Sequence, residues 1–202
     1  MQPRTIRQHA LQYAQERGFS LLEILVAVGI LLVLTGITVP IASRAIQTYR
    51  LTDVATQVAG NIKMARFEAI RKDALVNWQI KQAGNTTTVF VDPDRAGNFG
   101  PKVKAAIFNT NLNVVPADDV PNTAGLAVAI GAKTLTPVNP LNTAITFDAR
   151  GAVTGVPTAY AVYISDNTPG SPGANYRAVI LLPSGITQIW LAASDGAWRQ
   201  LS

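Results

Sequence analysis

The amino-acid sequence predicts an α+β protein in which one long amino-terminal helix packs on a β-rich carboxy-terminal domain. The run from Ile24 to Ser43 contains no charged residue, and its length and composition suit a membrane-spanning helix. After Asp73, apolar residues no longer recur at helical spacing, and short runs rich in β-branched and aromatic residues alternate with turn residues. Several short strands after one helix are typical of an antiparallel sheet packed on that helix.

The predicted helix extends from about Leu22 to Lys72. Its first half is apolar on every side and is expected to lie in lipid. Gly36 and Pro40 are expected to soften or kink it there, because proline removes a backbone hydrogen-bond donor. In its second half, apolar residues recur in steps of three and four, which predicts an amphipathic helix covering a soluble domain. These residues are Leu51, Val54, Val58, Ile62, Ala65 and Ala69.

The remainder of the chain is predicted to form short strands separated by turns. The stretch from Ala105 to Phe147 has few charged residues and much Asn, Thr and Pro. It is expected to contain long loops, and an additional hairpin is an alternative for part of it. The predicted strands are residues 76–81, 86–91, 103–108, 144–147, 159–164, 176–182 and 186–191.

Composition argues against catalysis. The 202 residues include no cysteine and one histidine, His9, so the thiol nucleophile, the usual general base and most zinc ligands are missing. We therefore expect no enzymatic activity, no cofactor and no metal. The spacing of Asp92, Asp94 and Gly97 is like the start of a calcium loop, but the later ligands of such a loop are missing, which favours a β-turn. A net charge of +5 is mild for a nucleic-acid-binding protein.

The segment before the apolar run is unusual. Gly18-Phe19-Ser20-Leu21-Leu22-Glu23 follows a leader that carries three arginines. Basic residues before a span favour a cytoplasmic amino terminus, but Arg44 and Arg50 follow the span and weaken that argument on its own. A charged side chain inside a bilayer costs about 2.5–3.5 kcal/mol, so a simple anchor gains nothing from Glu23. The position of this carboxylate therefore predicts a specific use.

These residues resemble the class III signal of type IV pilins and type II secretion pseudopilins. The resemblance implies that a prepilin peptidase cleaves after Gly18 and that the new amino terminus, Phe19, is N-methylated. It also implies that Glu23 pairs with the amino terminus of a neighbouring subunit during filament assembly. Pro40 stands where the helices of that family often carry a proline. The leader of residues 1–18 is longer than is common with Phe at the cut.

Three later motifs are similar to those of the GspH/FimT pseudopilins. They are residues 65–71, residues 145–151, and residues 176–180 followed by Gly185. The resemblance implies a minor pseudopilin or minor pilin, a non-enzymatic part that initiates or caps a type II secretion pseudopilus or a type IV pilus.

The implied organisation has three parts. Residues 1–18 are a cleaved leader, and residues 19–45 are a transmembrane and assembly helix. Residues 46–202 are a periplasmic head, made of helix 46–72 and a β-rich part 73–202. The implied partners are the prepilin peptidase, other pilins or pseudopilins through the amino-terminal helix, and the inner membrane before assembly. The mature chain is then expected in a periplasmic or surface filament.

Two alternatives remain at this point. Some proteins of this family bind DNA during natural transformation, and Arg177, Arg199, Lys102 and Lys104 are the candidate contacts here. The turn at Gly185 lacks the arginines expected for that role, and two to four phosphate contacts would make binding weak. The other alternative is a membrane-anchored binding module that never enters a filament.

Overall fold

The computed structural model describes most of the chain after the predicted leader. The chain divides into two compact units, one ending at Ser43 and one comprising Arg44–Ser202. Both contain part of the longest element, helix α1 (Leu21–Lys72). The described residues are 19–84, 86–97, 104–109, 112–139, 143–155, 158–166, 175–192 and 196–201.

The part of α1 that precedes Arg44 exposes its apolar side chains all around. Among the described residues, α1 is the one helix long and apolar enough to cross a membrane by length and composition; its apolar window has a mean hydropathy of 2.7 and is 0% buried. Three hydroxyl groups in this part bond back to the helix: Thr35 to the carbonyl of Leu31 at 2.7 Å, Thr38 to Leu34 at 2.8 Å and Ser43 to Val39 at 3.1 Å. Polar side chains inside lipid need such internal partners.

The part of α1 from Arg44 onward buries one face. The predicted stripe from Leu51 to Ala69 is buried, together with Ala55, Ala59 and Asn61. The helix ends in a Schellman motif, in which Asp73 N–H donates to the carbonyl of Ile70 and Ala74 N–H donates to that of Ala69. Asp73 takes the left-handed conformation, with φ of 50°. This ending directs the chain into the first sheet.

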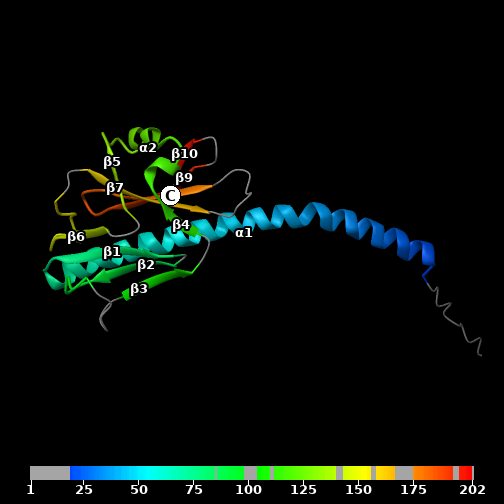
Figure 1. Ribbon diagram of the computed structural model, residues 1–202, viewed down its shortest axis with the longest axis horizontal. Coiled ribbons are helices and arrows are strands. Elements are labelled where there is room, and N and C mark those ends of the chain that lie inside the picture. The colour runs from blue at the N-terminus through cyan, green and yellow to red at the C-terminus, as the bar shows by residue number, and fades with distance from the viewer. Residues whose placement is uncertain are drawn as a thin grey trace, which may run out of the picture. The chain divides into compact units, whose positions relative to one another are not determined.

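The first sheet has four antiparallel strands in the order β3-β2-β1-β6 (Figure 1). Trp78 at the centre of β1 lies opposite Val91 on one side and Ile145 on the other. All three side chains are buried against α1, because alternate residues of a strand share a face. The strands are β1 (Val76–Ala83), β2 (Thr86–Asp92), β3 (Lys104–Asn109) and β6 (Thr143–Phe147).

The second sheet is antiparallel along the order β10-β9-β8-β7-β4, and β5 adds to β7 in parallel. Its central strands are buried on both faces. Val162, Val179 and their neighbours join α1 and the first sheet in one core, whereas Ala161, Ile180 and Trp190 form a second core with Leu126 of helix α2 (Thr123–Ala129). The strands are β4 (Leu112–Val115), β5 (Leu135–Pro137), β7 (Ala159–Asp166), β8 (Tyr176–Leu181), β9 (Thr187–Ala192) and β10 (Trp198–Leu201).

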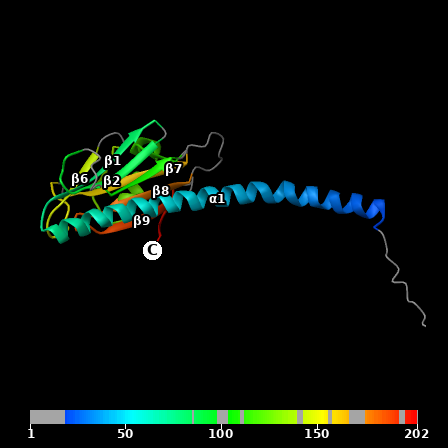
Figure 2. The same cartoon turned by 90° about the horizontal axis from the view of Figure 1, so that it is seen from below.

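Within the unit from Arg44 onward, both sheets lie along the same helix (Figure 2). The predicted fold class, a long amino-terminal helix packed on a carboxy-terminal antiparallel β-domain, is confirmed. The seven predicted strands are present with ends shifted by one or two residues.

The expectation of long loops between Ala105 and Phe147 needs correction. Described residues of this stretch form β4, the 3₁₀ turn Ala117–Asp119, α2 and β5. These pieces have three to seven residues, too few to show a periodic apolar pattern. Asn122 marks the start of α2, because its side-chain oxygen accepts the Gly125 N–H at 3.0 Å.

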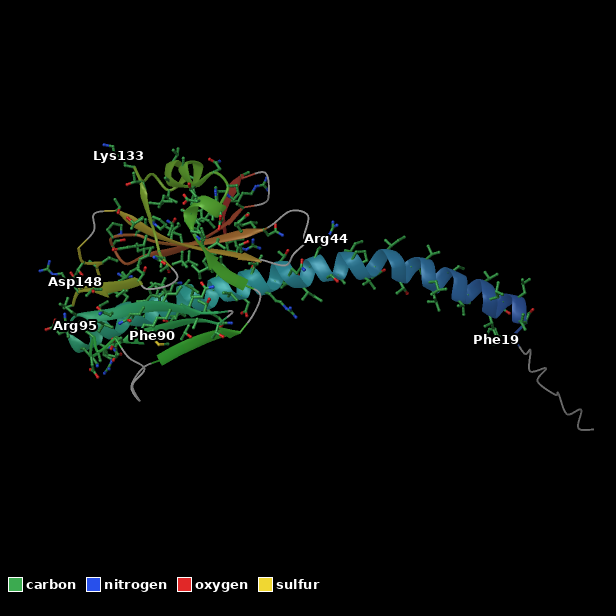
Figure 3. All side chains as sticks on the ribbon, in the orientation of Figure 1. Phe19, Arg44, Phe90, Arg95, Lys133 and Asp148 are labelled. Carbon is green, nitrogen blue, oxygen red and sulfur yellow. The ribbon has the colours of Figure 1, made fainter. Side chains whose placement is uncertain are left out.

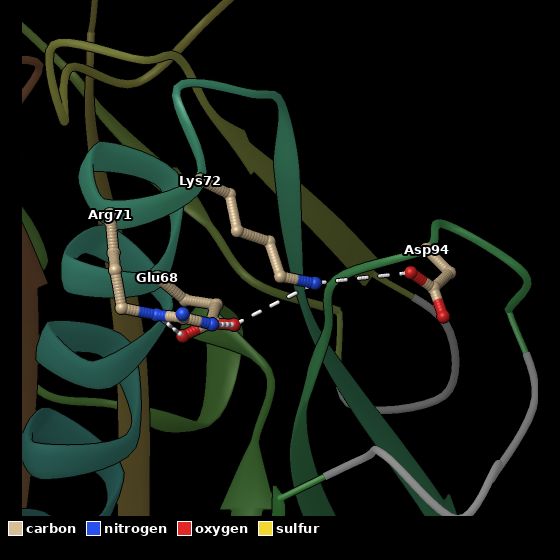
Figure 4. A network of polar contacts seen from close by, with 4 residues as sticks. All are labelled: Glu68, Arg71, Lys72 and Asp94. Atoms are coloured by element: carbon tan, nitrogen blue, oxygen red, sulfur yellow. Dashed lines mark hydrogen bonds and ion pairs between the residues drawn. The ribbon is translucent and has the colours of Figure 1, made fainter.

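A polar network fixes the end of α1 to the loop after β2. Glu68 pairs with Arg71 and Lys72, and Lys72 Nζ lies 3.9 Å from Asp94 Oδ1 (Figure 4). The nearby Asp92 is buried and accepts the Gly97 N–H at 2.7 Å and the Gln79 amide at 3.1 Å. The segment predicted as a β-turn thus uses the Asp92 carboxylate to hold the turn.

Candidate functional site

The start of α1 is the first candidate site, because the predicted processing and assembly residues gather there. Ser20 caps the helix: its hydroxyl accepts the Leu22 N–H at 3.3 Å, and its carbonyl accepts the Ile24 N–H at 3.1 Å. The caps of a helix satisfy N–H groups that have no partner inside it. Phe19 lies directly before the cap, is 78% exposed, and is labelled at the helix end in Figure 3. Gly18 lies outside the described residues.

Glu23 lies in the first turn of α1 and is exposed. Within residues 19–84 and the other described ranges, no side chain pairs with its carboxylate. The partial positive charge at a helix start favours an acid there, but this does not replace the hydration that lipid would remove. The pairing of Glu23 with the amino terminus of another subunit stays a prediction.

Ser20 is a residue that the sequence reasoning missed. Ser20 and Glu23 have the spacing of a capping box, in which the serine and the acid each accept a backbone N–H at the helix start. In the structure the Ser20 hydroxyl accepts the Leu22 N–H, one residue before the N–H that a capping box uses. The pattern Ser-x-x-Glu was the available signal, and it places the helix start directly after Phe19.

Pro40 lies inside α1, which continues through it. Its missing N–H leaves the carbonyl of Gly36 without its usual helical donor. This is the weakest hydrogen-bonding point of the apolar part of the helix. Its role in assembly stays a prediction.

Arg177, one of the candidate DNA contacts, lies inside the protein. Its side chain is 1% exposed and faces α1. Nε and Nη2 each donate to the Thr52 hydroxyl at 3.2 Å, Nη2 also lies 3.5 Å from the Thr48 carbonyl, and Nη1 donates to the Tyr176 carbonyl at 3.0 Å. Burial lowers the pKa of the guanidinium. Arg177 therefore ties β8 to the helix and is not available to phosphates.

The other basic candidates are not brought together by the described residues. Arg199 is exposed on β10 and shares a sheet face with Arg177, since both lie opposite Leu191. Lys102 lies outside the described residues, and Lys104 begins β3, where side chains are not described. Trp190 is 7% exposed and bonds Gln188, as expected for a core residue. DNA binding stays an untested alternative, and the described residues do not bring its candidate contacts together.

Replacement of Arg177 by alanine should destabilise the protein by about 2–4 kcal/mol, because it leaves a cavity and unpaired acceptors. Methionine fills much of the same volume, so Arg177→Met should recover most of that loss. The measurement is denaturant unfolding of the full chain in detergent, monitored by tryptophan fluorescence. Equal losses in the two variants would show that the hydrogen bonds, and not the packing, carry the contribution of Arg177.

A second candidate site is the contact between the turns that contain Gly151 and Gly185, next to Arg66 of α1. Arg66 Nε donates to the carbonyl of Gly151 at 3.1 Å. A Cβ on Gly185 would lie 2.0 Å from that carbonyl oxygen, and Gly185 has φ of 79°. Both glycines belong to motifs identified in the sequence, but their mutual contact was not predicted. Only glycine at 185 allows the two turns to approach this closely.

No group of three or more His, Cys, Asp or Glu side chains that could hold a metal ion occurs among the described residues.

Comparison with known proteins supports the interpretation of the amino-terminal segment. Residues 13–39 match a family model described as the prokaryotic N-terminal methylation motif. Pilin-like protein PilA1 of Thermus thermophilus is 36% identical over 86 residues, which are 42% of this chain and 54% of that protein. The chain thus spans about half the length of the curated relative it matches. These findings confirm the predicted resemblance to type IV pilin-like proteins.

A crystal structure of the type IV minor pilin FimU from Pseudomonas aeruginosa (strain PAO1) aligns with 77% of this chain and 96% of its own, with a TM-score of 0.48 and 14% identity.

Proposed function

From its type IV pilin-like amino-terminal segment, we propose that this chain is a minor pilin or minor pseudopilin, anchored in the inner membrane and then built into a filament. It acts as a structural subunit of the GspH/FimT kind that initiates or caps the filament. Residues 46–202 are its periplasmic head.

The observation that carries this proposal is Glu23 at the start of the apolar helix. Its carboxylate is unpaired within the described residues, and the uncharged run of the helix follows it directly. In lipid this carboxylate is costly. It becomes favourable when an amine from another subunit approaches, because a buried charge needs a paired partner.

Cleavage after Gly18 supplies that amine. It frees the amino group of Phe19 four residues before Glu23, and it removes Arg4, Arg7 and Arg17 from the chain. The apolar face that lipid covers before assembly is then covered by neighbouring helices. Cleavage thus converts a membrane anchor into an assembly element.

Replacement of Gly18 by leucine should block cleavage, because the peptidase is expected to require a small residue before the cut. The full chain would be expressed in its native host, and its size and amino-terminal peptide determined by immunoblot and mass spectrometry. The matched control is Gly29→Leu, because nothing lies within 4 Å of a Cβ placed at Gly29. A normally shortened Gly18→Leu chain would show that the processing site lies elsewhere.

The type of filament is tested by cross-linking in cells. We expect a methylated peptide that begins at Phe19, linked to other pilin-like subunits. Links to secretion pseudopilins would assign the chain to a type II secretion pseudopilus, and links to pilus subunits would assign it to a type IV pilus. A chain that keeps its leader and has no pilin-like partner would overturn the proposal in favour of an unassembled binding module.

A further inference from the structure

A hollow of about 330 Å³ lies on the unit from Arg44 onward, beside the last turns of α1. It is lined by Lys63, Arg66 and Phe67 of α1, and by Gly185, Ile186 and Thr187 at the turn into β9. We name it the α1–β9 hollow. Its volume is enough for one or two side chains of a partner, and too small for a folded element.

The α1–β9 hollow has two large apolar side chains in its walls, and both are open to solvent. Phe67 is 68% exposed and Ile186 is 50% exposed. Met64 and Ile70, one helical turn to either side of Phe67, are 38% and 44% exposed. Large apolar side chains that gather on a surface, rather than occurring singly, mark an interaction site. The opposite face of the same helix turns is buried in the core, and these exposed side chains do not contribute to that core.

The polar groups of the hollow are cationic and have spare hydrogen-bonding capacity. Lys63 is exposed and has no partner among the described residues. Arg66 uses Nε for the Gly151 carbonyl, while its two terminal nitrogens bond nothing in the described ranges. The buried hydroxyl of Thr187 also has no partner within the part of the chain that the structure describes.

Among the residues that the structure describes, no carboxylate lines the hollow. The contrast with the next turn of α1 is clear, because Arg71 and Lys72 are both paired there with Glu68. The cations of the hollow therefore lack the counter-charge that their neighbours have within the described ranges.

The hollow is also rigid at its base. The turn before β9 is held by Gly185 N–H donating to the Leu182 carbonyl at 2.8 Å and by Leu182 N–H donating to the Ile186 carbonyl at 2.9 Å. Val153 N–H donates to the Pro183 carbonyl at 2.9 Å, which fixes this turn to the one that contains Gly151. A preformed recess loses little conformational entropy when a partner binds.

We propose that the α1–β9 hollow docks a segment of a neighbouring pilin-like subunit that presents an apolar side chain next to a carboxylate. The apolar side chain packs between Phe67 and Ile186, and the carboxylate binds Lys63 and the free edge of Arg66. This rests on the proposed function, since it assumes that the chain has pilin-like neighbours. A nucleic acid fits poorly, because it needs a row of cations along its backbone.

The first test replaces Phe67 with the photoreactive residue benzoylphenylalanine in the full chain, expressed in its native host. Irradiation should yield an adduct, mapped by mass spectrometry, to a peptide of another pilin-like subunit that contains an acidic residue. The matched control carries the same residue at Val128, which is 78% exposed on α2 and should give few adducts. Equal adducts at both positions, or adducts to peptides without an acid, would overturn the proposal.

The second test reverses one charge. Lys63→Glu should lower the Phe67 adduct about tenfold, since like charges then meet across the interface. Lys133→Glu makes the same change on an exposed lysine after α2 (Figure 3) and should leave the adduct unchanged. Changing the mapped acid of the partner to lysine should restore the adduct of the Lys63→Glu chain. Absence of a loss, or of a rescue, would contradict the charge pairing.

A third position separates this inference from the function on which it rests. The same photoreactive residue at Leu31, in the apolar part of α1, reports contacts between assembled helices. Adducts at Leu31 without adducts at Phe67 would overturn the docking site and leave the filament role standing. Absence of adducts at both positions would overturn both.

Discussion

A chain in which glutamine replaces Glu23 should still insert, be cleaved and be methylated, yet it should fail to enter filaments. The amide has nearly the shape of the carboxylate but no charge, so it cannot form an ion pair with the amino terminus of a neighbouring subunit. Loss of one partner of a buried charge pair costs about 2–5 kcal/mol, so incorporation should fall about 30-fold or more. The measurement is the amount of the protein in sheared or purified filaments relative to the amount in membranes.

The matched control for Glu23 is Thr35→Val. It also removes a polar group from the apolar part of α1, but Thr35 bonds the Leu31 carbonyl of its own helix and carries no charge. Its incorporation should stay near the level of the unchanged chain. Normal incorporation of Glu23→Gln would contradict the pairing role, whereas equal losses in both variants would point to a general demand for polar groups in the helix.

Long, regular features of this fold were predictable from the sequence. The helix from Leu21 to Lys72 carries two signals that extend over many residues, an uncharged run and a stripe of apolar residues at helical spacing. The strand around Trp78 likewise combines β-branched and aromatic residues with flanking turns. A pattern that extends over many residues predicts its element reliably, because one or two residues that favour another conformation do not outweigh it.

Short elements and contacts between distant segments were not predictable in the same way. Helix α2 has seven residues, and its start depends on one side chain, Asn122. Strand β10 has four residues and gains its place by pairing with β9. The burial of Arg177 depends on Thr48 and Thr52, which are more than 120 residues away in the chain. A basic residue in a strand is expected to be a surface charge until the helix that covers it is known.

The candidate site was predicted unevenly for the same reason. Phe19 and Glu23 belong to one short motif, so their proximity at the helix start follows from the sequence itself. The α1–β9 hollow joins residues from α1 and from the turn before β9, and no local pattern relates these. The glycines at 151 and 185 were recognised as motif residues, but the reason for them is their approach to each other.

Because the turns that contain Gly151 and Gly185 approach each other so closely, Gly185→Ala should destabilise the protein by about 3 kcal/mol. A residue with φ of 79° incurs about 1–2 kcal/mol when it is not glycine. The added Cβ would also lie 2.0 Å from the Gly151 carbonyl oxygen, a backbone atom that two turns hold in place. Overpacking of this kind adds about 1–3 kcal/mol. Denaturant unfolding of the full chain in detergent, monitored by tryptophan fluorescence, measures the loss in free energy of unfolding.

Substitutions at two other glycines distinguish the cost of a positive φ from the cost of the steric clash. Gly131→Ala changes a residue with φ of 71° and nothing within 4 Å, so it should cost only the backbone term. Gly151→Ala, with φ of 77°, meets side-chain atoms of Ile70 and Arg66 at 2.8 and 2.9 Å, and these can move aside. Stability should therefore fall in the order Gly131→Ala, Gly151→Ala, Gly185→Ala. If Gly185→Ala costs no more than Gly131→Ala, the two turns are not in the close contact that shapes the base of the α1–β9 hollow.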